Sequence, residues 1–226
     1  MLRDDRALRL RVDLRLQLVT DIARAAQEAA TVRKATAGER GGLAAVLSRA
    51  FYDDPQMVWV LPDDARRREL LERGFALYLR KLWFEQDECY TTDHIAGAVV
   101  WELPGQWKAG VLDQLRLLPP MARIYGRLLP RVLRALAKLE SNHPSEPHYY
   151  LPFAGVDPQW QGRGLGTALM RPVLDRCDDT KTPAYLEASS PRNRALYERH
   201  GFEVTEEFLL GAGSPPIWRM WRAPQG

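Results

Sequence analysis

The fold is decided by His148-Tyr-Tyr-Leu-Pro-Phe-Ala-Gly-Val-Asp-Pro-Gln-Trp-Gln-Gly-Arg-Gly-Leu-Gly-Thr167. Residues 149–156 are apolar and aromatic, which is the composition of a buried strand. Asp157-Pro158 ends this strand, because proline cannot donate to a ladder and keeps the preceding residue extended. Gly162, Gly164 and Gly166 then precede a run that is typical of a helix. The stretch therefore predicts a strand, a glycine-rich turn and a helix.

The glycine-rich turn has the features of an anion-binding site. The first turn of a helix leaves backbone N–H groups without partners, and the helix dipole favours negative charge there. Glycine lets a ligand approach the backbone, since it has no Cβ. A dinucleotide fingerprint would need glycine where Thr167 stands, and a P-loop would need a Gly-Lys pair, which the chain lacks. The remaining pattern, Gln161-x-x-Gly164-x-Gly166, indicates either a phosphate cradle or a tight turn without a ligand.

A second motif follows downstream. Residues 184–202 read Ala-Tyr-Leu-Glu-Ala-Ser-Ser-Pro-Arg-Asn-Arg-Ala-Leu-Tyr-Glu-Arg-His-Gly-Phe, with Asn193 and Tyr197 four positions apart before Gly-Phe. Together with Gln-Gly-Arg-Gly-Leu-Gly, this run resembles the two signatures of the GNAT superfamily of N-acetyltransferases. Within the superfamily, Pro183-Ala-Tyr-Leu-Glu and Pro191-Arg-Asn are similar to the puromycin-acetyltransferase-like branch. The resemblance covers residues 32–226 and is strongest after His148.

The order of predicted elements is that of an α+β domain with a mixed sheet. The resemblance implies a GNAT-like, mostly antiparallel sheet flanked by helices, in which the central parallel strands, here residues 149–156 and 184–188, splay apart. It also implies acetyl-CoA as the acetyl donor, with its pantetheine arm in that opening. The GNAT domain would span residues 32–226, and residues 1–31 would be an N-terminal extension of uncertain role. The residues expected to bind acetyl-CoA are Ala154, Gly155, Val156, Gln161, Gly162, Arg163, Gly164, Leu165, Gly166, Thr167 and Asn193.

Hydrophobic periodicity predicts the other elements. Helices are expected over residues 38–51 and 64–84, and a hairpin over residues 88–103 has its second strand buried on both faces. Residues 107–139 predict two or three helices interrupted at Pro119-Pro120 and at Pro130. Residues 8–18 fit a strand and a helix equally well.

Composition excludes several classes of protein. The net charge is +3, and residues of both signs are mixed along the chain, so no nucleic-acid-binding stripe is expected. Cys89 and Cys177 lie far apart without a Cys or His at ligand spacing, which predicts free thiols and no metal site. The longest apolar run is too short to cross a bilayer. Free thiols fit a reducing cytoplasm, which is therefore the expected location.

Acetyl transfer to an amine needs a base, an oxyanion donor and an acid. Tyr197 is the candidate acid for the leaving thiolate, unless it is a core tyrosine on an amphipathic helix. Glu187 is the candidate base, or else a partner in a hydrogen bond or ion pair within the sheet. The backbone N–H of Ala154 is the candidate oxyanion donor. Asn193 binds pantetheine, caps its helix, or does both. His148 is a second candidate base, because histidine titrates near neutral pH, but a surface histidine is the favoured interpretation.

The acceptor site is the least defined part of the sequence. Asp53 and Asp54 either attract a cationic acceptor or only stop a helix. Five aromatic residues are candidates for lining an acceptor pocket: Tyr52, Trp59, Trp101, Trp107 and Phe153. The chain is predicted to be an acetyl-CoA-dependent N-acetyltransferase that acts on the primary amine of a small molecule, as a monomer or homodimer. The alternatives are acetylation of a protein or peptide, and a catalytically silent CoA-binding sensor.

Overall fold

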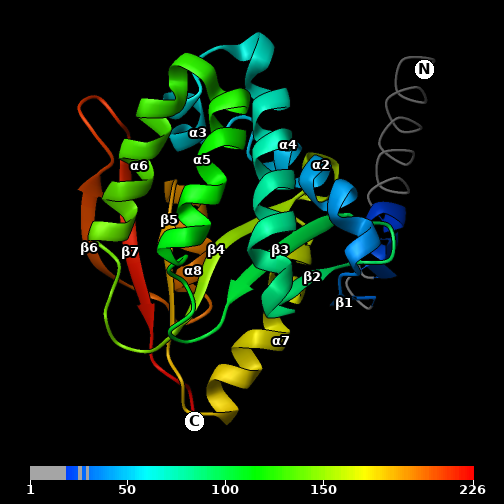
Figure 1. Cartoon of the computed structure of the whole chain (residues 1–226). Helices are drawn as coiled ribbons and strands as arrows, with labels where there is room; N and C mark the ends of the chain where they lie inside the picture. The colour runs from blue at the N-terminus through cyan, green and yellow to red at the C-terminus, as the bar shows by residue number, and fades with distance from the viewer. Residues whose placement is uncertain (1–18, 25–26, 29–30) are drawn as a thin grey trace, which may run out of the picture.

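The computed structural model describes residues 19–24, 27–28 and 31–226. Its centre is a seven-stranded sheet in the order β1-β2-β3-β4-β5-β7-β6 (Figure 1). The strands are β1 (Arg33–Lys34), β2 (Cys89–Thr91), β3 (Gly97–Glu102), β4 (Tyr149–Val156), β5 (Ala184–Ala188), β6 (Glu203–Leu209) and β7 (Pro216–Arg222). The undecided stretch, residues 8–18, lies outside the described residues, as does most of the predicted extension.

The central strands of the sheet diverge. All neighbouring strands are antiparallel except β4 and β5. These two pair only at Tyr149↔Ala184 and Tyr150↔Tyr185, although both continue beyond that point. The prediction of a mixed, mostly antiparallel sheet with splayed parallel strands is confirmed.

A β-bulge accompanies this divergence. The pairing of β3 with β4 shifts between Val100↔Phe153 and Glu102↔Tyr150, so β4 carries one extra residue there. A bulge bends its strand and interrupts the ladder. It therefore accommodates Pro152, which has no N–H to donate.

Helices cover both faces of the sheet. Alternate residues of β3 enter two different cores: Ala98 and Val100 pack in one, and Val99 and Trp101 in the other. The first core joins the sheet to α2 (Arg40–Ala50), α4 (Asp64–Lys81), α5 (Val111–Tyr125) and α6 (Leu129–Ser141), and the second joins it to α7 (Leu165–Asp179) and α8 (Pro191–Glu198). Every residue of β3 is buried, as its apolar sequence predicts.

The structure corrects two predictions about helices. The prediction that Pro119-Pro120 interrupts a helix is wrong, because α5 continues through both prolines. The carbonyls that lose their partners belong to Leu115 and Arg116, which are exposed and open to water. The break falls at Gly126, with φ +52°, before the short η3 helix (Gly126–Leu128). A further helix, α3 (Pro55–Val60), follows directly after Asp53 and Asp54 and was not predicted.

The described part of the chain holds no helix with both the length and the apolar character needed to cross a membrane.

Candidate active site

The glycine-rich turn between β4 and α7 is open. Gly162 and Gly164 adopt φ +77° and +82°, and a Cβ built at either position would meet no atom within 4 Å. Gly164 is the N-cap of α7, and its carbonyl accepts the first helical bond from Ala168. The backbone N–H groups of the intervening residues, 165–167, therefore have no acceptor within the helix. The turn has the free donors and the space that a diphosphate needs.

The side chains of this turn already have partners within the protein. The Gln161 amide donates to the Val156 carbonyl at 3.0 Å. The Arg163 guanidinium donates to the Asp21 carboxylate at 3.0 Å. The expectation that both residues lie beside the diphosphate stays a prediction. Thr167, whose hydroxyl lies 3.0 Å from His200 Nε2, is the polar side chain in the first turn of α7.

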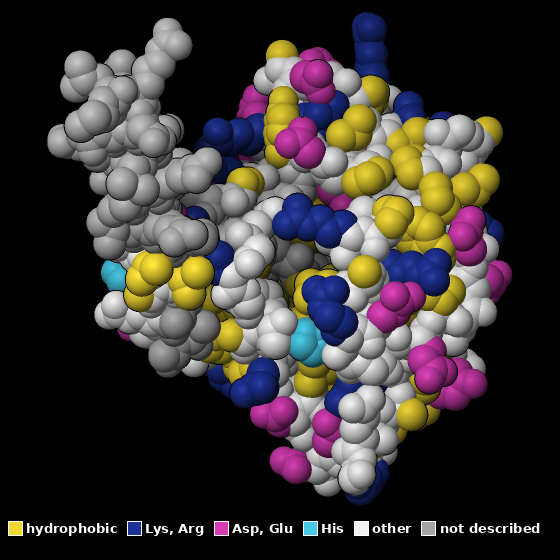
Figure 2. All heavy atoms as spheres, turned by 180° about the vertical axis from the view of Figure 1, so that it is seen from behind, with side chains coloured by type: hydrophobic (Ala, Val, Ile, Leu, Met, Phe, Trp, Pro, Cys, Tyr) yellow, Lys and Arg dark blue, Asp and Glu magenta, His cyan; other side chains and the backbone are white. Residues whose placement is uncertain are grey.

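The surroundings of this cradle are positively charged. Burial lowers the pKa of His200 first, and the nearby charges of Arg199, Arg222 and Arg171 lower it further. Seen from behind, basic side chains border a hollow in the surface (Figure 2). Of these arginines, Arg171 lines the hollow beside Gly164 and Thr167 and can attract an anionic ligand, whereas Arg222 is buried in an ion pair with Asp178.

The C-terminal half of β4 lies beside the opening, where β5 no longer pairs with it. Ala154 and Gly155 pair with Val99 and Ala98 of β3, so one edge of β4 is occupied and the other faces the opening. Gly155 has a structural reason to be glycine. A Cβ there would lie 2.9 Å from both Ala50 Cβ and Leu47 Cδ2, so α2 can pack against the strand only without it.

Tyr197 and Asn193 stand on α8 beside the opening. Tyr197 is 8% exposed, and burial raises the pKa of its phenol well above the usual value. In the part of the chain that the structure describes, its hydroxyl makes no hydrogen bond. The interpretation of Asn193 as a helix cap is wrong, because the Ser190 hydroxyl caps α8 by accepting from the Asn193 backbone. The Asn193 amide instead lies 3.4 Å from the Ser189 hydroxyl.

Ser189 connects α8 to α3. Its hydroxyl donates to the buried Asp54 carboxylate, which also accepts from the backbone N–H groups of Gln56 and Met57 and so caps α3. Burial raises the pKa of Asp54 in spite of these bonds. Asp54 thus does more than stop a helix, since it fixes the end of β5 against α3.

Glu187 lies on β5 at the edge of the opening. Its carboxylate accepts hydrogen bonds from the hydroxyls of Tyr150 and Tyr185, each at 2.8 Å. Burial raises the pKa of Glu187 to about 7, while the two tyrosines and then the charge of Arg219 act in the opposite direction. A carboxyl group that titrates near neutral pH suits a general base.

Two histidines with buried side chains lie beside Glu187, first His143 and then His148. His148, predicted on the surface, is 1% exposed because the 142–147 connector folds over it. Its Nδ1–H donates to the Glu146 carbonyl at 2.6 Å, so its Nε2 accepts from His143 Nε2–H at 2.9 Å. His143 Nδ1 therefore carries the lone pair, 4.0 Å from Glu187 Oε1. Burial lowers the pKa of His143 to about 3, which keeps it neutral.

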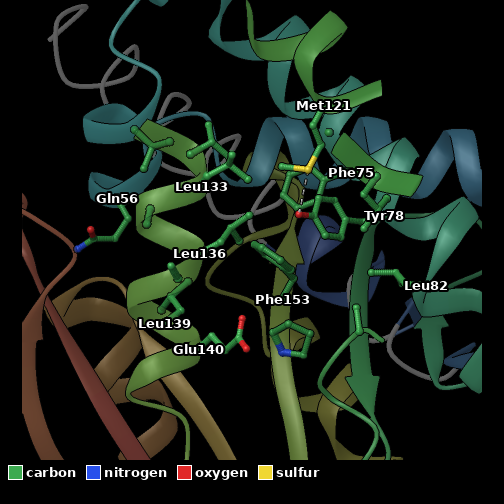
Figure 3. Close-up of a pocket in the computed structure, with 18 of the residues that line it drawn as sticks. Gln56, Phe75, Tyr78, Leu82, Met121, Leu133, Leu136, Leu139, Glu140 and Phe153 are labelled. Carbon is green, nitrogen blue, oxygen red and sulfur yellow. Dashed lines mark hydrogen bonds between the residues drawn. The ribbon is translucent and has the colours of Figure 1, made fainter. Parts of the chain in front are cut away.

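A cavity of about 600 Å³ opens between the sheet and α3, α4, α5 and α6, with Glu187 and His143 in its lining. Its walls are largely apolar, and Phe75, Tyr78, Phe153, Leu133 and Leu136 point into it (Figure 3). Of the five aromatic residues expected to line an acceptor pocket, Trp107 and Phe153 do so, and Trp107 stacks on His143 with centroids 3.6 Å apart. The others, Tyr52, Trp59 and Trp101, do not line this cavity.

Sequence reasoning missed Glu102 in the cavity lining. This residue ends β3 and is 6% exposed. Its Oε1 accepts from the Trp83 indole N–H at 2.9 Å. No motif surrounds Glu102, and the only signal would have been a carboxylate within an otherwise apolar strand.

Residues 50–202, more than half of the chain, match the acetyltransferase (GNAT) family. The chain belongs to this family and is an N-acetyltransferase. Family membership implies acetyl-CoA as the acetyl donor.

Similar proteins span nearly the same length. The chain is 27% identical over 201 residues to an N-acetyltransferase of Schizosaccharomyces pombe, which covers 80% of this chain and 78% of the relative. A structure from Corynebacterium glutamicum, described as histone acetyltransferase HPA2 and related acetyltransferase, has a TM-score of 0.64 at 24% identity and covers 87% and 97% of the two chains. The polyamine N-acetyltransferase of Drosophila melanogaster has a TM-score of 0.54 at 20% identity and covers 85% and 98%. These structures share the fold of this chain.

Proposed function

We propose that this enzyme transfers the acetyl group of acetyl-CoA to the primary amine of a small molecule, by direct attack of the amine on the thioester. The observation that carries the proposal is the position of Glu187. This near-neutral carboxyl group lies at the opening between β4 and β5, in the lining of the cavity. An amine in the cavity and a thioester in the opening would meet beside it.

Each step has a candidate residue on the described elements. The turn from Gly162 to Thr167 would bind the diphosphate through backbone N–H groups, and the free edge of β4 would hold the pantetheine. The N–H of Ala154 would stabilise the oxyanion that forms when the amine attacks. Glu187 takes a proton from the acceptor ammonium. Tyr197 gives its proton to the departing thiolate and regains one from the nitrogen of the tetrahedral intermediate. The sum is one amide, one CoA thiol and one released proton.

Tyr197→Phe tests the proposed acid. The substitution removes one oxygen and preserves the ring that packs on Phe202 at 6.0 Å. We expect turnover to fall by about 10²-fold, because the thiolate must then leave unprotonated, with less than a twofold change in acetyl-CoA affinity. Parallel thiol-release and calorimetric measurements check this. Wild-type turnover in the variant would reduce Tyr197 to a packing residue.

Three finer assignments belong to this proposal. A small-molecule acceptor is supported by the enclosing cavity and by the Drosophila enzyme, whose name gives it a polyamine substrate. The histone acetyltransferase description of the Corynebacterium structure keeps a protein acceptor as the second candidate. The likeness of residues 183–193 to the puromycin-acetyltransferase-like branch stays a prediction.

A thiol-release assay separates these candidates. Acetyl-CoA and enzyme are mixed with a panel of primary amines, and in parallel with lysine-containing peptides. Release with small amines alone supports the proposal, and release with peptides alone supports the second candidate. Tight acetyl-CoA binding without release for any acceptor indicates a CoA-binding sensor.

A further inference from the structure

Glu102 carries a buried oxygen without a partner. Its Oε1 accepts from Trp83, but its Oε2 has no hydrogen bond to any described residue. Burial raises the pKa of Glu102 to about 8, and the charge of Glu187 adds to this effect, so the carboxyl group is mostly protonated at neutral pH when the cavity is empty. A bound ammonium group would favour its ionised form, because an opposite charge lowers the pKa of a carboxyl group. An unpaired carboxyl oxygen in an apolar wall is unfavourable unless a ligand supplies the missing donor.

The register of the sheet places Glu102 on the same side as Glu187. Glu102 pairs with Tyr150 across β3 and β4, and paired residues present their side chains to the same face. The Tyr150 hydroxyl in turn reaches Glu187, and both carboxyl groups line the cavity. An amine bound by Glu102 would therefore lie on the same face of the sheet as the Glu187 carboxyl group.

The charged side chains that line the cavity are mostly acidic. Asp54, Glu102, Glu140 and Glu187 line it, against a single basic side chain, Lys108, which is paired with Glu140 at 2.5 Å. The amide oxygen of Gln56, also in the lining, is buried and has no partner among the described residues. A ligand that donates hydrogen bonds fits this lining, and a carboxylate or phosphate does not.

The cavity wall formed by α5 and α6 is apolar from the interior to the entrance at the protein surface. Met121, Leu133 and Leu139 line the cavity from α5 and α6 (Figure 3). Leu115 and Leu118 of α5 also line it and are 57% and 38% exposed, so the apolar surface continues outward. Leucine side chains at an entrance favour a ligand whose body is apolar over one that carries further charges.

We propose that the acceptor is a primary amine on an uncharged, apolar body, with its ammonium group bound by Glu102 before the proton passes to Glu187. This inference rests on the proposed function for the identity of the acceptor. It sets this site apart from one for a polyamine, because a second ammonium group would lie among the leucines of α5 and α6. Glu102 is a substrate-binding residue here, and Glu187 is the base.

Binding without acetyl-CoA tests the inference apart from transfer. Phenylbutylamine, phenylbutanol and diaminobutane are titrated into the full chain while tryptophan fluorescence is followed, since Trp83 contacts Glu102 and Trp107 lines the cavity. We expect phenylbutylamine to bind at least about tenfold more tightly than the alcohol and the diamine. Equal or tighter binding of diaminobutane, or equal binding of phenylbutanol, would overturn the inference.

Glu102→Gln tests the ammonium contact. Glutamine keeps an oxygen for the Trp83 N–H and has the same shape, so the fold is expected to persist, which circular dichroism checks. The KM for phenylbutylamine should rise about tenfold or more with kcat changed less than threefold, and phenylbutanol binding should not change. Glu72→Gln, on the exposed face of α4, is the matched control.

The outcomes distinguish the two proposals. An unchanged KM in Glu102→Gln would refute the role of Glu102. If phenylbutylamine binds as expected but no amine in the panel releases thiol from acetyl-CoA, the transfer assignment fails while the binding inference stands.

Discussion

Glu187→Gln is expected to lower turnover at pH 7 by about 10²- to 10⁴-fold, the range that a positioned general base contributes. Glutamine keeps one oxygen that can accept from one of the two tyrosine hydroxyls, and its NH2 group can donate to the oxygen of the other, so the wall of the opening keeps its packing. What it cannot do is take the ammonium proton. Steady-state thiol release at saturating acetyl-CoA measures the effect, and calorimetry with CoA verifies that donor binding is preserved.

The pH profile separates a base from a merely structural carboxylate. A base must be ionised, so kcat should rise with pH and level off above the Glu187 pKa of about 7. This rising limb should be absent from Glu187→Gln. Tyr150→Phe removes one hydrogen bond that favours the carboxylate, so it should move the limb to higher pH. Leu186→Met, on the opposite face of β5, is the control and should leave the rising limb of the pH profile at the same pH. A limb that stays at the same pH in Glu187→Gln would assign it to another group.

The parts of the site that follow from local sequence were predictable. Positive φ angles at Gly162 and Gly164, and the bare N–H groups beyond them, depend on residues that are neighbours in the chain. The splayed strands followed from a family resemblance that is itself local, in two motifs. Glu187 was predicted beside the opening because it lies in the second of the splayed strands. Its pKa was not predictable, since it depends on burial by residues that are distant in sequence.

The parts that depend on distant contacts were not predictable. Arg163 has the pattern of a phosphate ligand, but it pairs with Asp21, which lies 142 positions away. Glu102 binds Trp83 from 19 positions away, and neither residue stands in a motif. His148 is buried by the connector that precedes it, and a polar, proline-containing segment gives no signal of that packing. Hydrogen bonds and ion pairs between residues that are distant in sequence can be assigned only once the structure is known.

Gly164→Leu is expected to weaken acetyl-CoA binding by at least about 100-fold. A side chain at this position would project into the open space over the N-terminus of α7, where a Cβ now meets nothing within 4 Å. It would displace the diphosphate from the backbone N–H groups of residues 165–167. Two lost hydrogen bonds to a charged group, at about 1.5–3 kcal/mol each, correspond to this loss of affinity or more. Isothermal titration with acetyl-CoA measures it.

The backbone angle of Gly164 requires a control, because φ +82° disfavours any residue with a Cβ by about 1–2 kcal/mol. Gly213 provides one: it has φ +73°, equally open surroundings and a place in the β6–β7 turn. Gly213→Leu should lose similar thermal stability and keep its acetyl-CoA affinity. Gly164→Ala should carry the same strain as Gly164→Leu with a smaller loss of affinity, since a methyl group fills less of the cradle. Equal affinities in wild type and Gly164→Leu would show that the diphosphate binds elsewhere.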